Sequence, residues 1–191
     1  MPLPQPTSTS PATRGMHRIQ RVSGILHMLL SLLLPGLPLL MGLGWALVPD
    51  ATVGASFGIF MGVGEGEELT LLDRGAGFIA SLLPLSVILY GVWHLRALFG
   101  LYADGEILGT ANAGRLRALA MTLILWLPAQ FVGDAVISLA LSIDNPPGER
   151  FIALNLSSND FAITMIGAIA LVISWVMVEA ARAADDSASI I

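Results

Sequence analysis

The stretch from Trp93 to Leu119, WHLRALFGLYADGEILGTANAGRLRAL, decides how this chain folds. It is a long polar passage that carries arginines, and it lies between the second and third of four apolar runs. Asp104-Gly105 in its middle is a helix-stop and turn signal. The stretch therefore predicts a turn between two antiparallel helices, and it fixes how the chain is threaded through a membrane.

The composition is that of a membrane protein. Of the 191 residues, 55% are hydrophobic and 12% are charged, whereas about 25% of the residues in soluble domains are charged. Apolar runs of about 18 or more residues are long enough to cross a bilayer. The absence of cysteine excludes disulfides, thiol catalysis and cysteine metal sites. The net charge of −5 is spread over loops and ends, so no nucleic-acid-binding surface is indicated.

The four apolar runs predict an all-α membrane protein, a bundle of four transmembrane helices. The expected helices cover residues 22–48, 77–102, 111–141 and 161–182. They form a single membrane domain, 14–182, between a disordered Pro-, Ser- and Thr-rich tail at 1–13 and a short tail at 183–191. Thr110 is placed to cap the third helix, and Asp160 to cap the fourth.

The two longer connections predict a small β-rich cap outside the cytoplasm. Residues 55–63 and 68–72 in the first connection mix apolar and β-forming residues between glycines. Residues 150–156 in the second connection look like a short strand that follows a Pro-Pro-Gly turn. A lone exposed strand leaves backbone groups unpaired, so we expect the strands of the two connections to pair with each other.

The distribution of arginines predicts the orientation in the membrane. Cytoplasmic loops of membrane proteins carry an excess of basic residues. Only Arg74 and Arg150 lie in the two longer connections. The other arginines lie near the chain ends or in the 93–119 stretch: Arg14, Arg18, Arg21, Arg96, Arg115, Arg117 and Arg182. We therefore expect both termini and the 93–119 stretch to be cytoplasmic.

Asp134 is the most unusual residue of the apolar runs. A carboxylate inside a membrane helix costs about 2.5–3.5 kcal/mol on insertion scales, so it marks a functional site by default. Gln130, Asp134 and Ser138 are spaced by four and share one face of the third helix, where they could conduct a proton or a cation. The alternative is a structural carboxyl near the outer end of its helix, hydrated or hydrogen-bonded to a neighbouring helix. The sequence leaves both readings open.

Two histidines, His27 and His94, are expected at similar depths in the first and second helices. They could sense pH or bind a metal, or they could simply pack at the membrane interface. A stable metal site normally has three or four ligands, and no carboxylate lies near them in the sequence. No Gly-x-Ser-x-Gly elbow or other catalytic constellation is present. We therefore predict no metal, no cofactor and no enzymatic activity.

Two patterns resemble a known family. The first is Leu98-Phe99-x-x-Tyr102-x-x-Gly105-Glu106-Ile107, continued by Thr110-x-Asn112-x-x-x-Leu116-Arg117. The second is a final helix that runs into Glu179-Ala-x-Arg182 and an acidic tail. Both are similar to a family of small bacterial four-helix membrane proteins known as a domain of unknown function, DUF2975. The resemblance covers residues 18–191, and Leu108-Gly109 stand where that family commonly has a phenylalanine.

The resemblance implies a place and a partner. Members of the family are often encoded beside a small helix-turn-helix regulator of the Cro/C1 type. It implies a protein of the bacterial cytoplasmic (inner) membrane that could hold such a regulator without contacting nucleic acid itself. The candidate docking residues are Tyr102, Gly105, Glu106, Asn112, Arg115 and Arg117. The alternative is a solvated turn whose arginines meet anionic lipid headgroups.

Two functions follow as hypotheses. The first is a non-enzymatic sensor or regulatory protein that tethers a partner, with the lipid bilayer as its surroundings. The second is a small transporter or permease component that uses the intramembrane carboxylate of Asp134.

Overall fold

The protein is all-α in the residues that its computed structural model describes, which are 11–47, 69–106, 109–143, 146–148, 150 and 152–188. The helices are α1 (Pro11–Leu47), α3 (Leu71–Ala103), α4 (Thr110–Ser142) and α5 (Ser158–Ala188). Each is long and apolar enough to cross a membrane, over Met16–Leu47, Leu71–Ala103, Thr110–Ser142 and Ser158–Ala180. The prediction of four apolar, membrane-compatible helices is confirmed.

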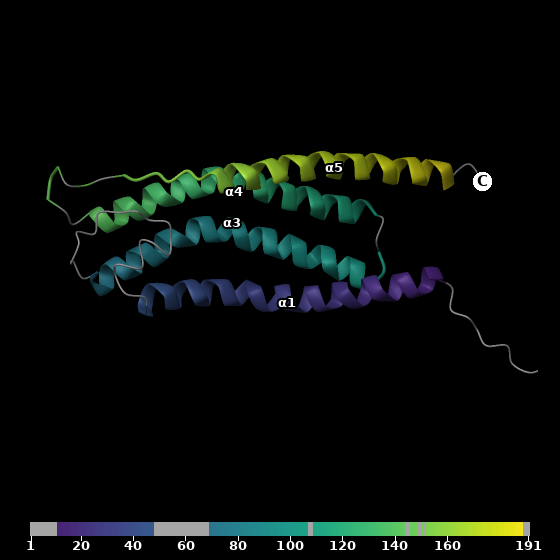
Figure 1. Ribbon diagram of the computed structural model, residues 1–191, viewed down its shortest axis with the longest axis horizontal. Helices are drawn as coiled ribbons and strands as arrows, with labels where there is room; N and C mark the ends of the chain where they lie inside the picture. The colour runs from purple at the N-terminus through teal and green to yellow at the C-terminus, as the bar shows by residue number, and fades with distance from the viewer. Residues whose placement is uncertain are drawn as a thin grey trace, which may run out of the picture.

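The helices lie side by side in chain order, each antiparallel to the next (Figure 1). Extensive contacts join only successive helices: α1 with α3, α3 with α4, and α4 with α5. The four helices therefore form one layer rather than a bundle around a central core. In a bilayer the lipid tails are as apolar as the side chains, so no hydrophobic force closes such a layer.

The two ends of the layer are named here after one residue each. At the Gly105 end, α1 begins, the α3–α4 turn lies and α5 ends. At the Trp45 end, α1 ends, α3 begins and α4 ends. Most large apolar side chains on all four helices are exposed, which suits a layer with lipid on both faces.

Trp45 forms the main apolar contact at its end of the layer. Its side chain is 1% exposed and packs with Ala80 of α3 and Ile137 of α4. The indole N–H donates to the Ser81 hydroxyl at 3.1 Å. The ring lies directly on Gly77, where any side chain would collide with it. One tryptophan therefore ties α1 to both α3 and α4.

The predicted β-rich cap is not supported by the described residues. The strand expected over 68–72 is wrong at Leu71 and Leu72, which form the first turn of α3. Thr70 and Asp73 form a capping box there: the Asp73 amide donates to Thr70 Oγ1 at 3.2 Å, and the Thr70 amide to Asp73 Oδ2 at 2.9 Å. Residues 55–63 lie outside the described residues.

The strand expected over 150–156 is also wrong. Residues 152–157 are extended and join no strand among the described residues. Figure 1 shows this segment running along α4 before α5 begins. Its backbone amides are satisfied by side chains of α4, as described below, so no partner strand is needed.

The helix starts differ from the predicted ones in two places. Thr110 does not cap α4: the cap position is Gly109, which makes no side-chain hydrogen bond, and Thr110 is the first helical residue. α5 begins at Ser158 rather than Phe161, so Asp160 lies inside its first turn. Residues 11–13 and 183–188, which were expected in the tails, are helical.

Candidate functional site

A polar seam runs along α4, made of Gln130, Asp134 and Ser138. Residues four apart lie on one face of a helix, which is why the three side chains form a line. Asp134 is 6% exposed and Ser138 is fully buried. The predicted shared face is present, and it is covered by the extended segment 152–157, most of which the sequence analysis assigned to a strand of the β-rich cap.

The seam binds the backbone of that segment. The Ala153 amide donates to Ser138 Oγ at 3.0 Å, and the Asn155 amide donates to Asp134 Oδ2 at 3.1 Å. Two residues of extended chain span about 6.6 Å, and four residues of helix rise about 6 Å. Because these two distances nearly match, the amides of every second residue in the segment reach successive residues of the seam.

Gln130, the remaining residue of the seam, is also hydrogen-bonded. Gln130 Nε2 donates to Asp134 Oδ1 at 3.1 Å, so both carboxylate oxygens of Asp134 accept a hydrogen bond. The seam lies inside the apolar span of α4. Non-helical backbone is tolerated at membrane depth only where protein or a water-filled cavity satisfies it. The seam supplies that satisfaction at two positions of the segment.

The outward edge of the segment is apolar. Ile152, Leu154 and Leu156 are exposed and alternate with the residues whose amides face α4. Successive side chains of an extended chain point to opposite sides. The exposed apolar residues of the segment therefore recur with a period of two, as they do in a half-buried strand.

The segment ends where Trp126 meets Asp160. Trp126 Nε1 donates to Asp160 Oδ1 at 3.0 Å. Asp160 Oδ2 accepts from the Ser157 amide at 3.0 Å and from the Ser157 hydroxyl at 2.7 Å. Ser157 and Asp160 thus form the same kind of capping box that starts α3. Since Trp126 is the middle residue of α4, α5 begins beside the midpoint of its neighbour.

The chemistry of this site is anchoring. Asp134 and Asp160 are both largely buried, and every one of their carboxylate oxygens accepts a hydrogen bond from a protein group. Among the residues that the structure describes, no three His, Cys, Asp or Glu side chains stand close enough to hold a metal ion. The arrangement holds a non-helical segment against α4.

The two histidines are not brought together. His27 Nδ1 donates to the carbonyl oxygen of Arg96 at 3.0 Å, across the contact between α1 and α3. His94 Nδ1 accepts from Arg115 Nη1 at 3.3 Å, across the contact between α3 and α4. Each histidine thus has its own partner in a helix contact, as in the packing alternative.

The α3–α4 turn uses part of the predicted docking patch for its own structure. Gly105 has a φ of +90°, a left-handed conformation that glycine adopts readily. The Asn112 side chain is 1% exposed, and its amide group donates to the Glu106 carbonyl oxygen at 2.6 Å. Gly105 and Asn112 therefore shape the turn, while Glu106 leaves its side chain exposed.

Among the other predicted docking residues, some contact neighbouring side chains and one is exposed. Tyr102 is half-buried, with its ring edge-on to Phe99 at a centroid distance of 6.1 Å. Arg115 is engaged with His94. Arg117 is exposed on the first turns of α4. Glu106 and Arg117 are thus the members of the patch that a partner could reach most directly.

Sequence reasoning missed the two capping boxes and the tryptophan. Both boxes have the Ser/Thr-x-x-Asp spacing, in Thr70 to Asp73 and in Ser157 to Asp160, and this spacing is itself a recognised helix-start signal. Trp126 precedes Gln130 by four residues and so extends the line of the seam. Its partner lies 34 residues away, which no local pattern indicates.

Comparison with known proteins gives a family match. A family model described as "Protein of unknown function (DUF2975)" matches residues 68–191. The matched range includes α3, the α3–α4 turn, the polar seam and α5, while α1 precedes it. Neither a curated protein nor a solved structure matches the chain. The match covers most of the chain and all of the motif residues that suggested the resemblance, so this protein belongs to the DUF2975 family of proteins of unknown function.

Proposed function

We propose that this protein is a non-enzymatic regulatory or sensor protein of a bacterial cytoplasmic membrane, and that it tethers a cytoplasmic partner at the Gly105 end. The observation that carries the proposal is the length of α5. The helix runs to Ala188, and its last residues, 181–188, include the charged Arg182, Asp185 and Asp186. At about 1.5 Å per residue, residues 181–188 extend the helix by roughly 12 Å.

The extension is polar at its base. Glu179 and Arg182 are 80% and 70% exposed, and they form an ion pair with an N–O distance of 3.7 Å. A helix that leaves the apolar layer with charged, exposed side chains offers a partner a ready-made surface. The exposed Glu106 and Arg117 of the α3–α4 turn lie at the same end of the layer. Together these features make a docking surface on one end of the protein.

The distribution of charge supports the orientation. Arg18 and Arg21 lie near the start of α1, Arg117 near the start of α4, and Arg182 near the end of α5. These three helix termini belong to the Gly105 end. An excess of arginine marks the cytoplasmic side of a membrane protein. The partner is therefore cytoplasmic, and a small helix-turn-helix regulator encoded nearby is the first candidate.

The test is co-purification from gently solubilised membranes with an N-terminally tagged chain. One variant carries Glu106→Ala with Arg117→Ala, and another replaces residues 181–188 with a Gly-Ser segment. Arg21→Ala is the matched control, because it removes an exposed arginine from the same end on α1. A purified small helix-turn-helix regulator of the Cro/C1 type is added in a second, direct binding assay. We expect both docking variants to lose the partner and the control to retain it; equal retention by all of them sinks the proposal.

The alternative is a small transporter that uses Asp134. In its favour, two buried carboxylates, Asp134 and Asp160, lie within apolar spans. Against it, all of their oxygens already accept hydrogen bonds from the protein. Flux assays in liposomes separate the two functions. A transporter must move an ion under an imposed gradient and lose that flux in Asp134→Asn while staying folded.

A further inference from the structure

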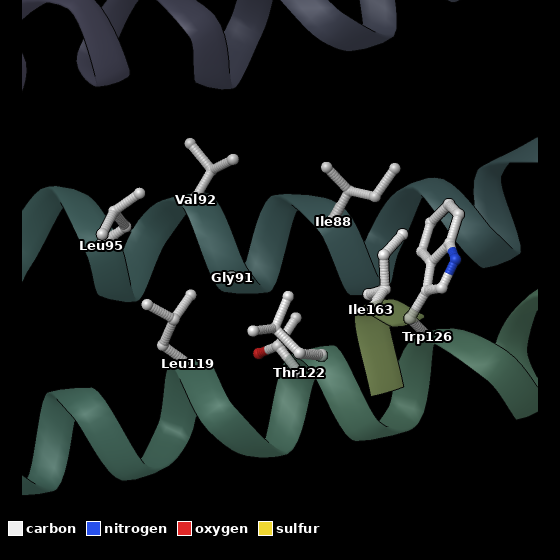
Figure 2. A pocket seen from close by; sticks show the side chains of 9 residues that line it. Ile88, Gly91, Val92, Leu95, Leu119, Thr122, Trp126 and Ile163 are labelled. Carbon is white, nitrogen blue, oxygen red and sulfur yellow. The ribbon is translucent and has the colours of Figure 1, made fainter. Parts of the chain in front are cut away.

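An apolar pocket of about 350 Å³ lies between α3 and α4, with α5 closing one side (Figure 2). Its main lining residues are Ile88, Val92, Leu95, Leu119, Leu123 and Ile163. Thr122 and Trp126 contribute the polar side-chain atoms of the lining, and both are already hydrogen-bonded. Thr122 Oγ1 donates to the Ala118 carbonyl oxygen at 2.9 Å, and Trp126 Nε1 donates to Asp160. The pocket thus presents hydrocarbon to whatever fills it.

The floor of the pocket is set by a close approach of two helices. Gly91 of α3 faces Thr122 of α4, and a β-carbon at Gly91 would lie 2.8 Å from Thr122 Cγ2. The helices therefore touch at this glycine, and the larger side chains on either side form walls. Figure 2 shows Leu95 and Leu119 at one end of the pocket and Trp126 with Ile163 at the other. The pocket is an elongated slot between these two pairs.

Water does not suit this slot. A stable buried water needs two to four polar partners, and the polar side-chain atoms of the lining are already hydrogen-bonded. A slender hydrocarbon chain fits the size and the chemistry.

The position of the slot indicates where this hydrocarbon chain comes from. It lies inside the apolar spans of α3, α4 and α5, so it is filled from the bilayer. The end marked by Leu95 points toward the Gly105 end of the layer. Arg96 follows Leu95 directly and stands one helical turn beyond Val92. Arg96 therefore lies just beyond the Leu95 end of the slot, on the side of α3 that faces Ser31 of α1.

Arg96 has hydrogen-bond donors that no described residue uses. Its Nε donates to the Ser31 hydroxyl of α1 at 2.6 Å, which fixes the guanidinium. Its two terminal amino groups have no hydrogen-bond or ion-pair partner in the part of the chain that the structure describes. A guanidinium binds a phosphate through two parallel hydrogen bonds. Basic pockets between transmembrane helices are a known setting for phospholipid headgroups.

We propose that this slot binds one phospholipid, with an acyl chain between α3 and α4 and the phosphate on Arg96. The chain runs from the Leu95–Leu119 end toward Trp126 and Ile163. The lipid belongs to the leaflet at the Gly105 end. This site shares no residue with the proposed docking surface, so either proposal can fail without the other.

Native mass spectrometry of the full chain, released from a mild detergent, tests the proposal. We expect one phospholipid to remain bound per protomer. Val92→Phe fills the slot, and Arg96→Gln removes the charge while keeping an amide donor for Ser31. Each variant should lower the lipid-bound fraction at least tenfold. Leu125→Phe, on an exposed apolar site of α4 outside the lining, and Arg21→Gln are the matched controls and should retain the lipid.

Rebinding to delipidated protein separates the chain from the phosphate. The probes are phosphatidylglycerol, a diacylglycerol with the same chains, and glycerol 3-phosphate. The wild type should bind phosphatidylglycerol at least tenfold more tightly than either other probe, and Arg96→Gln should bind phosphatidylglycerol and diacylglycerol alike. If Val92→Phe does not fold, Leu119→Phe fills the slot from the other wall. Equal lipid retention in test and control variants would mean non-specific annular lipid and would overturn the proposal, as would equal binding of diacylglycerol to the wild type.

Discussion

Trp126 and Asp160 determine where α5 begins. The indole N–H of Trp126, at the midpoint of α4, donates to Asp160 Oδ1 at 3.0 Å, and Asp160 in turn completes the capping box of α5 with Ser157. One side chain of α4 thus reaches the carboxylate that organises the first turn of α5. The start of α5 depends on its neighbour as well as on its own sequence.

Replacing Trp126 by Phe should therefore weaken the whole α4–α5 edge. The ring volume is largely kept, but a hydrogen bond to a charged acceptor is lost, which typically contributes about 1.5–3 kcal/mol. We expect the free energy of unfolding in mixed micelles to fall by that amount. Trp175→Phe is the control, because Trp175 is exposed on α5. A Trp126→Phe variant as stable as this control would contradict the assigned role.

The seam predicts a difference between two substitutions of Asp134. Asp134→Ala leaves the Asn155 amide and the Gln130 side chain without their acceptor, at a cost of about 1–3 kcal/mol. Asp134→Asn keeps one oxygen for the Asn155 amide and should cost less. Hydrogen exchange measured residue by residue checks this: the Asn155 amide should exchange much faster in the alanine variant. Equal exchange in both variants would show that Asp134 does not anchor the segment.

Gly167 should resist any side chain. A β-carbon there would lie 2.8 Å from Leu123 Cβ and 3.0 Å from the Ala120 carbonyl oxygen, so α4 and α5 would have to move apart. We expect Gly167→Ala to destabilise the protein by about 1–3 kcal/mol. Gly114→Ala is the control, since nothing lies within 4 Å of its added carbon. In a helix that change should stabilise by up to about 1 kcal/mol, so unfolding measurements should give opposite signs.

The capping assignments predict unequal effects for two threonines. Thr70→Ala removes the side chain that accepts the Asp73 amide at the start of α3 and should cost about 1 kcal/mol. Thr110→Ala should change stability little, because Thr110 makes no capping bond at the start of α4. Thermal unfolding of the two variants in detergent checks this. The reverse order would restore the sequence-based assignment of Thr110 as a cap.

The helices were predictable because length and hydrophobicity are local properties. The turn at Asp104-Gly105 was predictable for the same reason, and so was the shared face of Gln130 and Asp134, which follows from helical spacing. The predicted strand over 150–156 failed because alternation of apolar residues signals an extended chain but not its partner. The partner here is a polar line on a helix, which only the folded arrangement supplies.

The polar seam of Gln130, Asp134 and Ser138 was predictable as a candidate site, but its role was not. An isolated carboxylate in an apolar run signals either transport or anchoring, and the sequence carries nothing that separates the two. The anchoring contact that the structure shows is made by the amide of Asn155, which lies 21 residues from Asp134 in the chain. Contacts of this kind depend on how the α4–α5 connection folds back, which residue types alone do not specify.

Because α5 begins beside the midpoint of α4, residues 152–157 rather than a helix cover part of α4. The α4–α5 edge therefore has two parts that differ in local stability. Amides inside α5 open only when the helix itself unwinds, whereas those of Ala153 and Asn155 are held by two side chains of a neighbouring helix. Local opening follows such differences in bonding. Peeling back residues 152–157 breaks no helix, yet it exposes the buried carboxylate of Asp134 to its surroundings. Opening of residues 152–157 alone would therefore bring Asp134 within reach of a reagent or proton, without unfolding of the membrane domain.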